Sequence, residues 1–217
     1  MTREAFHQEL REIEEAVIQM AALVEGAIAR AMQALLRRDT LLAEDVRAGD
    51  VTVNELQRNI RNRCISVMAR QSPVARDLRE LTTVQLVITE LERMGDHAVG
   101  IAKQAIRIKE YEPLPIAGDL NELAKLVREQ VRAAIQAFID VNIQSARDIC
   151  AKDDEIDHEY KAIFSELLGV MTRDPNTVTQ GTALLFVAHD LERIGDRVTN
   201  ICEDIIYMVS GEIEELN

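Results

Sequence analysis

The sequence predicts an all-α protein made of two tandem three-helix bundles related by internal duplication. Gly and Pro are scarce, at 9 and 4 of 217 residues, which leaves little turn chemistry for a sheet of many strands. Aromatic residues make up only 3% and apolar residues 47%, so the core must be built from aliphatic side chains. Long stretches repeat apolar residues at spacings of three and four, the period of an amphipathic helix.

Six helices are expected, with only short breaks between them. The predicted helices span about 4–38, 40–71, 74–109, 118–142, 143–172 and 176–210. Asp39 and Thr40 form a capping pair before the second helix, and Ser72–Pro73 forms a turn after it. In the last helix two apolar positions recur every seven residues, which predicts a helix packed lengthwise in a bundle. These positions are Leu184, Leu191, Val198 and Ile205, together with Val187, Ile194, Ile201 and Met208.

The chain also repeats itself. Residues 90–103 align with 190–203 at an offset of 100, with Leu, Glu, Arg, Gly, Asp and Ile identical. Upstream the offset becomes 103, because the first hairpin turn is longer. Since repeated segments mark repeated structural units, we expect a first unit over 1–112 and a second over 116–217. The two units join near Pro113 and Pro115, which form a rigid connector.

Charge and local motifs exclude several classes of function. The formal charge of −13 disfavours binding to nucleic acid or to anionic membrane surfaces. No apolar run approaches the ~20 residues of a membrane-spanning helix, and the first residues lack a signal-peptide core. Three widely spaced cysteines imply neither a disulfide framework nor a zinc motif. Nucleophile elbows, Gly-rich phosphate loops and nucleotide fingerprints are absent. We therefore expect a cytoplasmic protein that is not an enzyme and does not insert into a membrane.

Pairs of acidic residues recur in the repeated segment. Residues four apart on a helix lie on the same face, and the preceding helix of each unit carries a similar pair. The candidate metal ligands are Asp50, Asn54, Glu92 and Asp96 in the first unit, and Asp153, Asp157, Glu192 and Asp196 in the second. Counted from the hairpin turns near residues 73 and 174, facing members agree in height within one residue. Antiparallel helices would therefore hold each set level, with axes ~8–10 Å apart.

Four such side chains would raise one another's pKa values and destabilise the hairpin, unless a multivalent cation were bound. Their donors are all hard oxygens, which favour Fe or Mn, allow Mg or Ca, and do not suit Zn. Gly95 and Gly195 are expected to be exposed helical glycines, which indicates close approach by another group.

Two alternatives stay open at this point. Acidic pairs on a helix are often an ordinary solvated face, and the neighbouring Arg of each motif could neutralise them without metal, which would make the protein a metal-independent scaffold. A carboxylate-bridged metalloenzyme is the other alternative. A buried metal beside a substrate pocket would favour the enzyme, whereas surface clusters without a cavity would favour an adaptor. Asn54 in place of a carboxylate makes the first set the weaker one.

The duplicated Leu-Glu-Arg-x-Gly-Asp, each copy preceded by Asp-x-x-x-Asp/Asn on the previous helix, resembles the PhoU family over essentially the full chain. Residues 72–79 are similar to that family's Pro-Val-Ala-x-Asp-Leu-Arg segment. The resemblance implies two three-helix bundles, often dimeric, with metal ions held on the bundle surface by the paired acidic motifs. It also implies a negative regulator of the phosphate regulon, with a phosphate ABC transporter ATPase and a sensor histidine kinase as partners.

The sequence departs from this pattern at a few positions besides Asn54. Gly100 and Lys103 stand where the second unit has Asn200 and Glu203, so we expect less support around the first acidic set. The second unit also has no copy of the segment 77–79.

Overall fold

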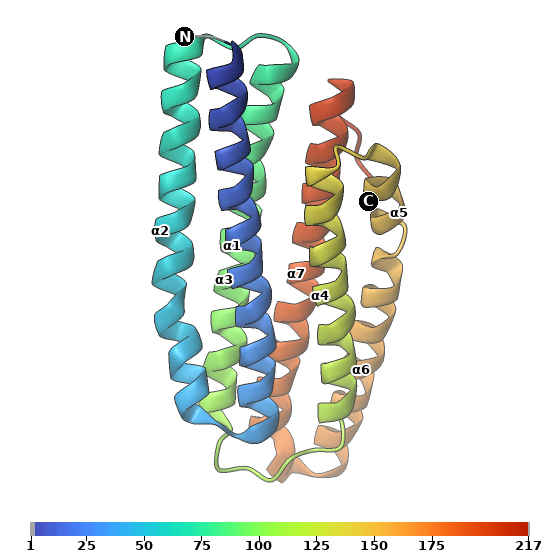
Figure 1. Cartoon of the computed structure of the whole chain (residues 1–217). Helices are drawn as coiled ribbons and strands as arrows, with labels where there is room; N and C mark the ends of the chain where they lie inside the picture. Colours follow the sequence, from blue (N-terminus) through green and yellow to red (C-terminus); the bar gives the residue numbers. More distant parts are fainter. Residues whose placement is uncertain (1–2, 217) are drawn as a thin grey trace.

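The computed structural model describes residues 3–216 and confirms the all-α prediction (Figure 1). Seven α-helices and one short 3₁₀ turn, with no strand, make up this part of the chain. The first unit contains α1 (Arg3–Arg37), α2 (Thr40–Gln71) and α3 (Arg76–Arg107). The second contains α4 (Ala117–Ile139), α5 (Ile143–Cys150), α6 (Asp153–Arg173), η1 (Pro175–Thr177) and α7 (Val178–Ser210). Residues 1, 2 and 217, at the outer ends of the predicted units, lie outside the described part.

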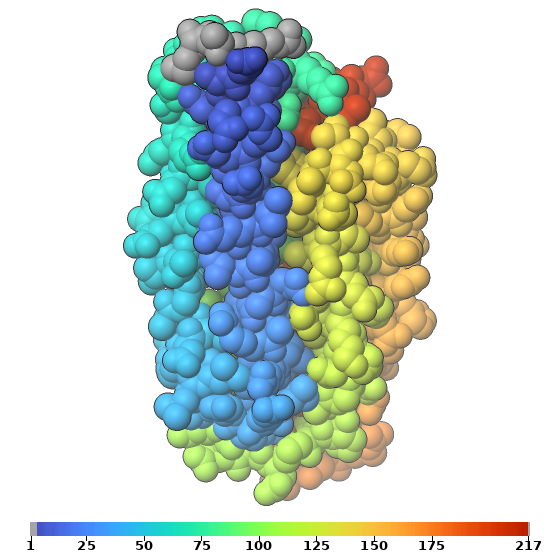
Figure 2. Space-filling model, viewed as in Figure 1, coloured from blue at the N-terminus to red at the C-terminus, as the bar shows by residue number. Residues whose placement is uncertain are grey.

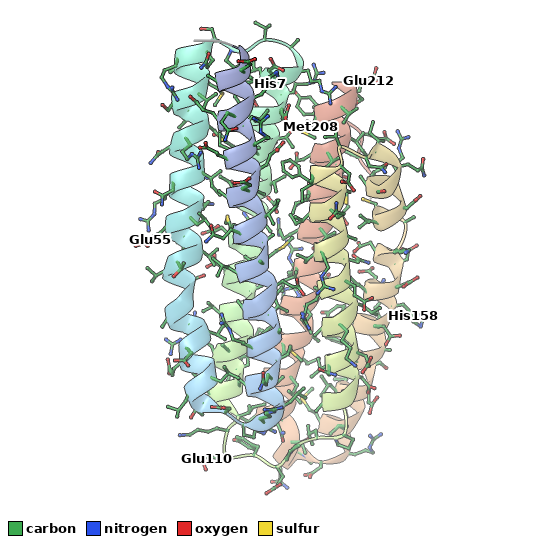
Figure 3. The ribbon with its side chains drawn as sticks, in the orientation of Figure 1. His7, Glu55, Glu110, His158, Met208 and Glu212 are labelled. Atoms are coloured by element: carbon green, nitrogen blue, oxygen red, sulfur yellow. The ribbon has the colours of Figure 1, made fainter. Side chains whose placement is uncertain are left out.

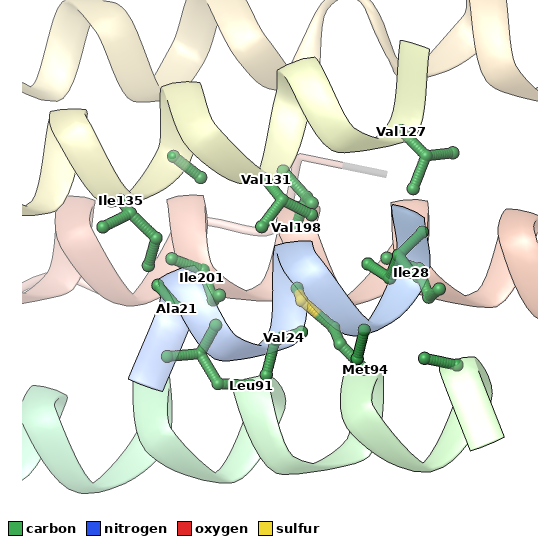
Figure 4. Packing of buried hydrophobic residues seen from close by; sticks show 14 of the residues in the cluster. Ala21, Val24, Ile28, Leu91, Met94, Val127, Val131, Ile135, Val198 and Ile201 are labelled. Atoms are coloured by element: carbon green, nitrogen blue, oxygen red, sulfur yellow. The ribbon is translucent and has the colours of Figure 1, made fainter. Parts of the chain in front are cut away.

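The two units lie side by side with their helices aligned (Figure 1). The most extensive contact in the molecule joins α3 of the first unit to α7 of the second, and α1 also packs on α4. Buried side chains of both units belong to one continuous hydrophobic core. Figure 4 shows part of it, where Val24 of α1 and Leu91 of α3 meet Val131 of α4 and Val198 of α7. The units are therefore structural repeats that share a core.

The seven-residue apolar pattern of the last helix is confirmed, since all eight of its positions are buried in α7. The outward faces of the outer helices carry polar side chains, such as Glu55 on α2 and His158 on α6 (Figure 3). The predicted cap at Asp39 is also confirmed, because its carboxylate accepts a hydrogen bond from the backbone N–H of Leu42 at 2.9 Å. No helix in residues 3–216 is long and apolar enough to cross a membrane.

The helix predicted over 143–172 is wrong in one respect, because it is broken into α5 and α6 at Ala151–Lys152. Three consecutive acidic residues, 153–155, form the first turn of α6, where the positive end of the helix dipole stabilises them. The side-chain amide of Gln130 on α4 donates a hydrogen bond to the Lys152 carbonyl at 3.1 Å, which satisfies one backbone group at the break. The break sets the start of α6 at Asp153, one of the candidate ligands.

Candidate metal centres

The first acidic set lies where α2 faces α3. A β-carbon built at Gly95 would lie 3.5 Å from Oδ1 of Asp50, so Asp50 stands level with the helical turn that carries Asp96. The side-chain amide of Asn54 donates a hydrogen bond to Oδ2 of Asp50 at 2.8 Å. The structure thus places Asp50 and Asn54 in contact with each other and directly beside the turn of α3 that carries Asp96.

Carboxylates of the first set raise the pKa values of Asp50 and Glu92 in addition to the effect of burial. Burial raises the pKa of the Asp50 carboxyl, and the charge of Asp96 raises it further. Burial also raises the pKa of Glu92, with added contributions from Asp96 and Asp50. The hydrogen bond from Asn54 and the charge of Lys103 act in the opposite direction on Asp50. Lys103 therefore supplies a positive charge to this set, where the second unit has an acid at the equivalent position.

The second acidic set lies where α6 faces α7. A β-carbon at Gly195 would lie 3.4 Å from Oδ1 of Asp153, which repeats the placement of Asp50 beside Gly95. Burial raises the pKa of Glu192, and the charges of Asp196 and Asp157 raise it further. Asp50 and Asp153 thus occupy equivalent positions in the two units, as the offset between the repeats requires.

Each set contains a carboxylate oxygen that is buried without a hydrogen-bond partner. These are Oδ1 of Asp50 in the first set and Oε2 of Glu192 in the second. The Nδ1 atom of His189 lies 3.5 Å from the latter oxygen. A buried acceptor with no donor is costly, so both oxygens lack a partner that a bound cation would provide.

The side chains do not converge on a single point as they stand. Among residues 3–216 no three His, Cys, Asp or Glu side chains lie close enough together to hold a metal ion. In the second set Asp157 is paired with Lys161 at 2.8 Å, and Asp196 with Arg193 on its own helix. Both are surface ion pairs of low stability, so rotation of these side chains toward Glu192 costs little.

The expectation that Gly95 and Gly195 are exposed is wrong, because both are buried. The close approach predicted there is made by the neighbouring helix. A β-carbon at Gly195 would lie 3.3 Å from the side chain of Ile156, and one at Gly95 would lie 3.5 Å from that of Val53. The two glycines therefore set the spacing within each hairpin, which lets the acidic residues of its two helices face one another.

A set of polar contacts between the two units was missed by sequence reasoning. Glu90 on α3 is buried, and it accepts hydrogen bonds from Asn200 at 3.2 Å and from Arg197 at 3.4 Å, both on α7. Asp190 on α7 pairs in turn with His97 on α3. The sequence repeat contained a signal that could have predicted these contacts. Positions 90 and 190 are both acidic, and positions 97 and 197, seven residues later, are both basic.

The departures at Gly100 and Asn200 are explained by these contacts. Asn200 is a donor to Glu90, whereas a β-carbon at Gly100 would lie 2.5 Å from Oδ2 of Asp190. Position 100 therefore has to be glycine for Asp190 to lie where it does. Both residues serve the contact between units.

The segment 77–79 also acts between the units. The Nε of Arg79 donates a hydrogen bond to the carbonyl oxygen of Met208 at 3.2 Å, and its guanidinium lies against Gly211. Gly211 caps α7 with a positive φ of 78°. The first unit thus supplies a cap for α7, the last helix of the second unit. Because this is a single helix end, the segment 77–79 is needed in only one of the two units.

The fold and these hairpins define a class of protein: a duplicated helical bundle with a matching acidic face on each repeat. The sequence pattern of the PhoU domain matches the chain twice, over residues 17–105 and 120–205. The chain therefore belongs to the PhoU family.

Individual relatives match over nearly the full length. The chain is 38% identical to a phosphate-specific transport system accessory protein PhoU homolog of Clostridium acetobutylicum, covering 100% of both chains. It is 33% identical to the homolog of the same description from Streptococcus pneumoniae, over 99% of this chain and 100% of the other. The crystal structure of PhoU from Pseudomonas aeruginosa superposes with a TM-score of 0.91 at 33% identity, covering 95% of this chain and 100% of that one.

Proposed function

We propose that this protein is a cytoplasmic regulator that represses phosphate uptake and phosphate-regulon signalling, without catalysing a reaction. Its main support is the full-length similarity of both repeats to accessory proteins of a phosphate-specific transport system. Its partners in this proposal are the ATPase of the phosphate ABC transporter and a sensor histidine kinase, and it acts as a homodimer. A rigid bundle with a shared core suits an adaptor, because it presents fixed surfaces to two partners at once.

We further propose that each acidic hairpin holds a metal ion on oxygen ligands. In the first unit the ligands are Asp50, Asn54, Glu92 and Asp96. In the second they are Asp153, Asp157, Glu192 and Asp196. The unpartnered buried oxygens of Asp50 and Glu192 support this. The raised pKa values of Asp50 and Glu92 in the first set and of Glu192 in the second, caused by burial and then by neighbouring carboxylates, support it as well. Hard oxygen donors favour Fe or Mn, with Mg or Ca as alternatives and Zn disfavoured.

The space beside the first set favours an adaptor over an enzyme. The cavity that borders Asp50 and Gly95 measures about 20 Å³, which is room for one water, and Arg30 of α1 also lines it. It is far too small for an organic substrate beside the carboxylates. A cation held by the first acidic set would supply positive charge that neutralises the facing carboxylates. The close contact of Gly95 with Val53 sets the spacing of α2 and α3.

Deletion of the gene in its host tests the regulatory role. Expression of phosphate-starvation genes is measured at high external phosphate, in the deletion strain and in the same strain complemented with the wild-type gene. We expect high expression in the deletion strain and repression on complementation. Unchanged expression in the deletion strain would contradict the proposed regulatory role.

A further inference from the structure

A pocket of about 290 Å³ lies between α1 and α4, on the face shown in Figure 2, where the two units meet. Its apolar lining includes Met32, Leu36 and Ala124. Met32 and Ala124 belong to the buried core, so this part of the pocket is rigid. Both repeats contribute to it, and it lies on helices other than those that carry the acidic hairpins.

The charge of this pocket contrasts with that of the whole chain. The net charge is −13, yet the pocket is lined by Arg37, Lys125 and Arg128 and by no acidic residue. Gln33 and Asn121 add two side-chain amides. A cluster of cations in a strongly acidic protein focuses a local positive potential, which raises the concentration of anions at that point.

The cations of the pocket are only partly neutralised by neighbouring carboxylates. Lys125 is paired with Glu122 at 2.7 Å. Arg128 is paired with Glu25, but Glu25 also binds Arg132, so one carboxylate serves two guanidinium groups. Arg37 makes no ion pair within residues 3–216.

One atom of the pocket is also left without a partner. The Nε of Arg128 is buried and has no acceptor. A buried donor of this kind costs free energy, and an anion that drew the guanidinium toward the pocket would remove the cost.

From this arrangement we propose that the α1–α4 pocket binds a small organic phosphate, such as a nucleoside phosphate. Guanidinium and ammonium groups are the side chains that bind phosphate oxygens most strongly. Met32 and Leu36 accept the apolar part of the ligand, and the amides of Gln33 and Asn121 contact its polar edge. The volume lies near the lower end of sites for small organic ligands, about 300–1,000 Å³. The pocket is larger than a phosphate ion alone requires. The proposal does not depend on the regulatory role proposed above.

Isothermal titration calorimetry of the full chain tests this proposal, with AMP, ATP and inorganic phosphate as separate probes and with sulfate as a control anion at matched ionic strength. The test variant is Arg37→Gln with Lys125→Gln, because both side chains are exposed and neither is part of the core. The matched control is Arg47→Gln with Lys109→Gln, which removes the same charge from exposed cations elsewhere. Far-ultraviolet circular dichroism verifies that both variants keep the wild-type helix content.

We expect saturable binding of at least one nucleotide to the wild-type chain. The affinity should fall by about tenfold or more in the test variant, since two charge-assisted hydrogen bonds are lost. It should stay within about twofold in the control variant, because surface charges elsewhere act only through screened long-range fields. The proposal is overturned if neither nucleotide binds, or if both variants lose affinity equally. It is also overturned if inorganic phosphate or sulfate binds as tightly as the nucleotides, because the apolar lining would then contribute nothing.

Discussion

The Nδ1 of His97 on α3 lies 2.9 Å from Oδ1 of Asp190 on α7, so a side chain of the first unit pairs with one of the second. Arg197 and Glu90 make the reciprocal contact at 3.4 Å. Position 90 corresponds to 190 and position 97 to 197 in the repeat. The two contacts are therefore related by an approximate twofold axis between α3 and α7. They fix the register of the two central helices.

Replacement of Glu90 by Ala should lower the free energy of unfolding by about 1–3 kcal/mol. The change removes the carboxylate that pairs with Arg197, whose side chain is only 16% exposed. It also removes the acceptor of the hydrogen bond from Asn200. Urea denaturation followed by circular dichroism measures the loss. Replacement of Glu55, an exposed acid on α2, by Ala is the control and should have little effect. Equal stability of the Glu90 variant and the control would show that the polar contacts between units are not stabilising.

Gly26→Ala and Gly100→Ala form a matched pair of helical substitutions. No atom lies within 4 Å of a β-carbon built at Gly26, so that change should stabilise the protein by up to about 1 kcal/mol. At Gly100 the new methyl group would displace the Asp190 carboxylate from His97, which offsets the gain in helix propensity. Thermal unfolding should therefore rank the Gly26 variant clearly above the Gly100 variant. The reverse order would contradict the contact described for Asp190.

Leu191→Ala should destabilise the fold by about 2–5 kcal/mol, because Leu191 is fully buried in the shared core and its removal leaves a cavity. Leu41→Ala serves as the control, since Leu41 is 79% exposed. Chemical denaturation of the two variants compares them directly. A loss below about 1 kcal/mol for Leu191→Ala would mean that the core collapses to fill the space.

The double variant Glu192→Gln with Asp196→Asn should lose metal uptake in the second hairpin while keeping its helix content. Both changes preserve side-chain shape and remove the charge that a cation requires. Elemental analysis after exposure to Fe or Mn and removal of excess metal measures the stoichiometry. Asp154→Asn with Glu166→Gln, two exposed acids on α6, is the control pair. A double variant that keeps the wild-type stoichiometry would contradict the ligand assignment.

Asp204 on α7 should make stability depend on pH. Burial raises its pKa to about 7, with added contributions from the charges of Glu90 and Glu203. Because the folded protein holds this proton more tightly than the unfolded chain does, Asp204 becomes more destabilising as pH rises from about 4 to about 7. Asp204→Asn removes the titration. The variant should gain stability relative to wild type across that range, as measured by urea denaturation at several pH values. A constant difference between the two proteins from pH 4 to 8 would show that Asp204 titrates normally.

The helices and the seam of α7 could be predicted because local period and capping determine them. The break at Ala151–Lys152 was not predicted, because the apolar pattern continues across it and only the acidic run 153–155 marks the new helix start. The contact of Glu90 with α7 and the contact of Asp190 with α3 were missed for a different reason. The arrangement of the two repeats in space is a tertiary property, and no local pattern specifies it. Binding of metal by the acidic hairpins stays a prediction.

The shared core has a consequence for how such a chain could arise. Each helix at the boundary meets its own counterpart, with α1 against α4 and α3 against α7, which is the isologous arrangement of a twofold dimer. A single ancestral unit could have covered the same apolar surfaces by association with an identical copy. Fusion of two such units would replace a concentration-dependent association by an intramolecular one, and it would allow positions such as Gly100 and Asn200 to diverge separately.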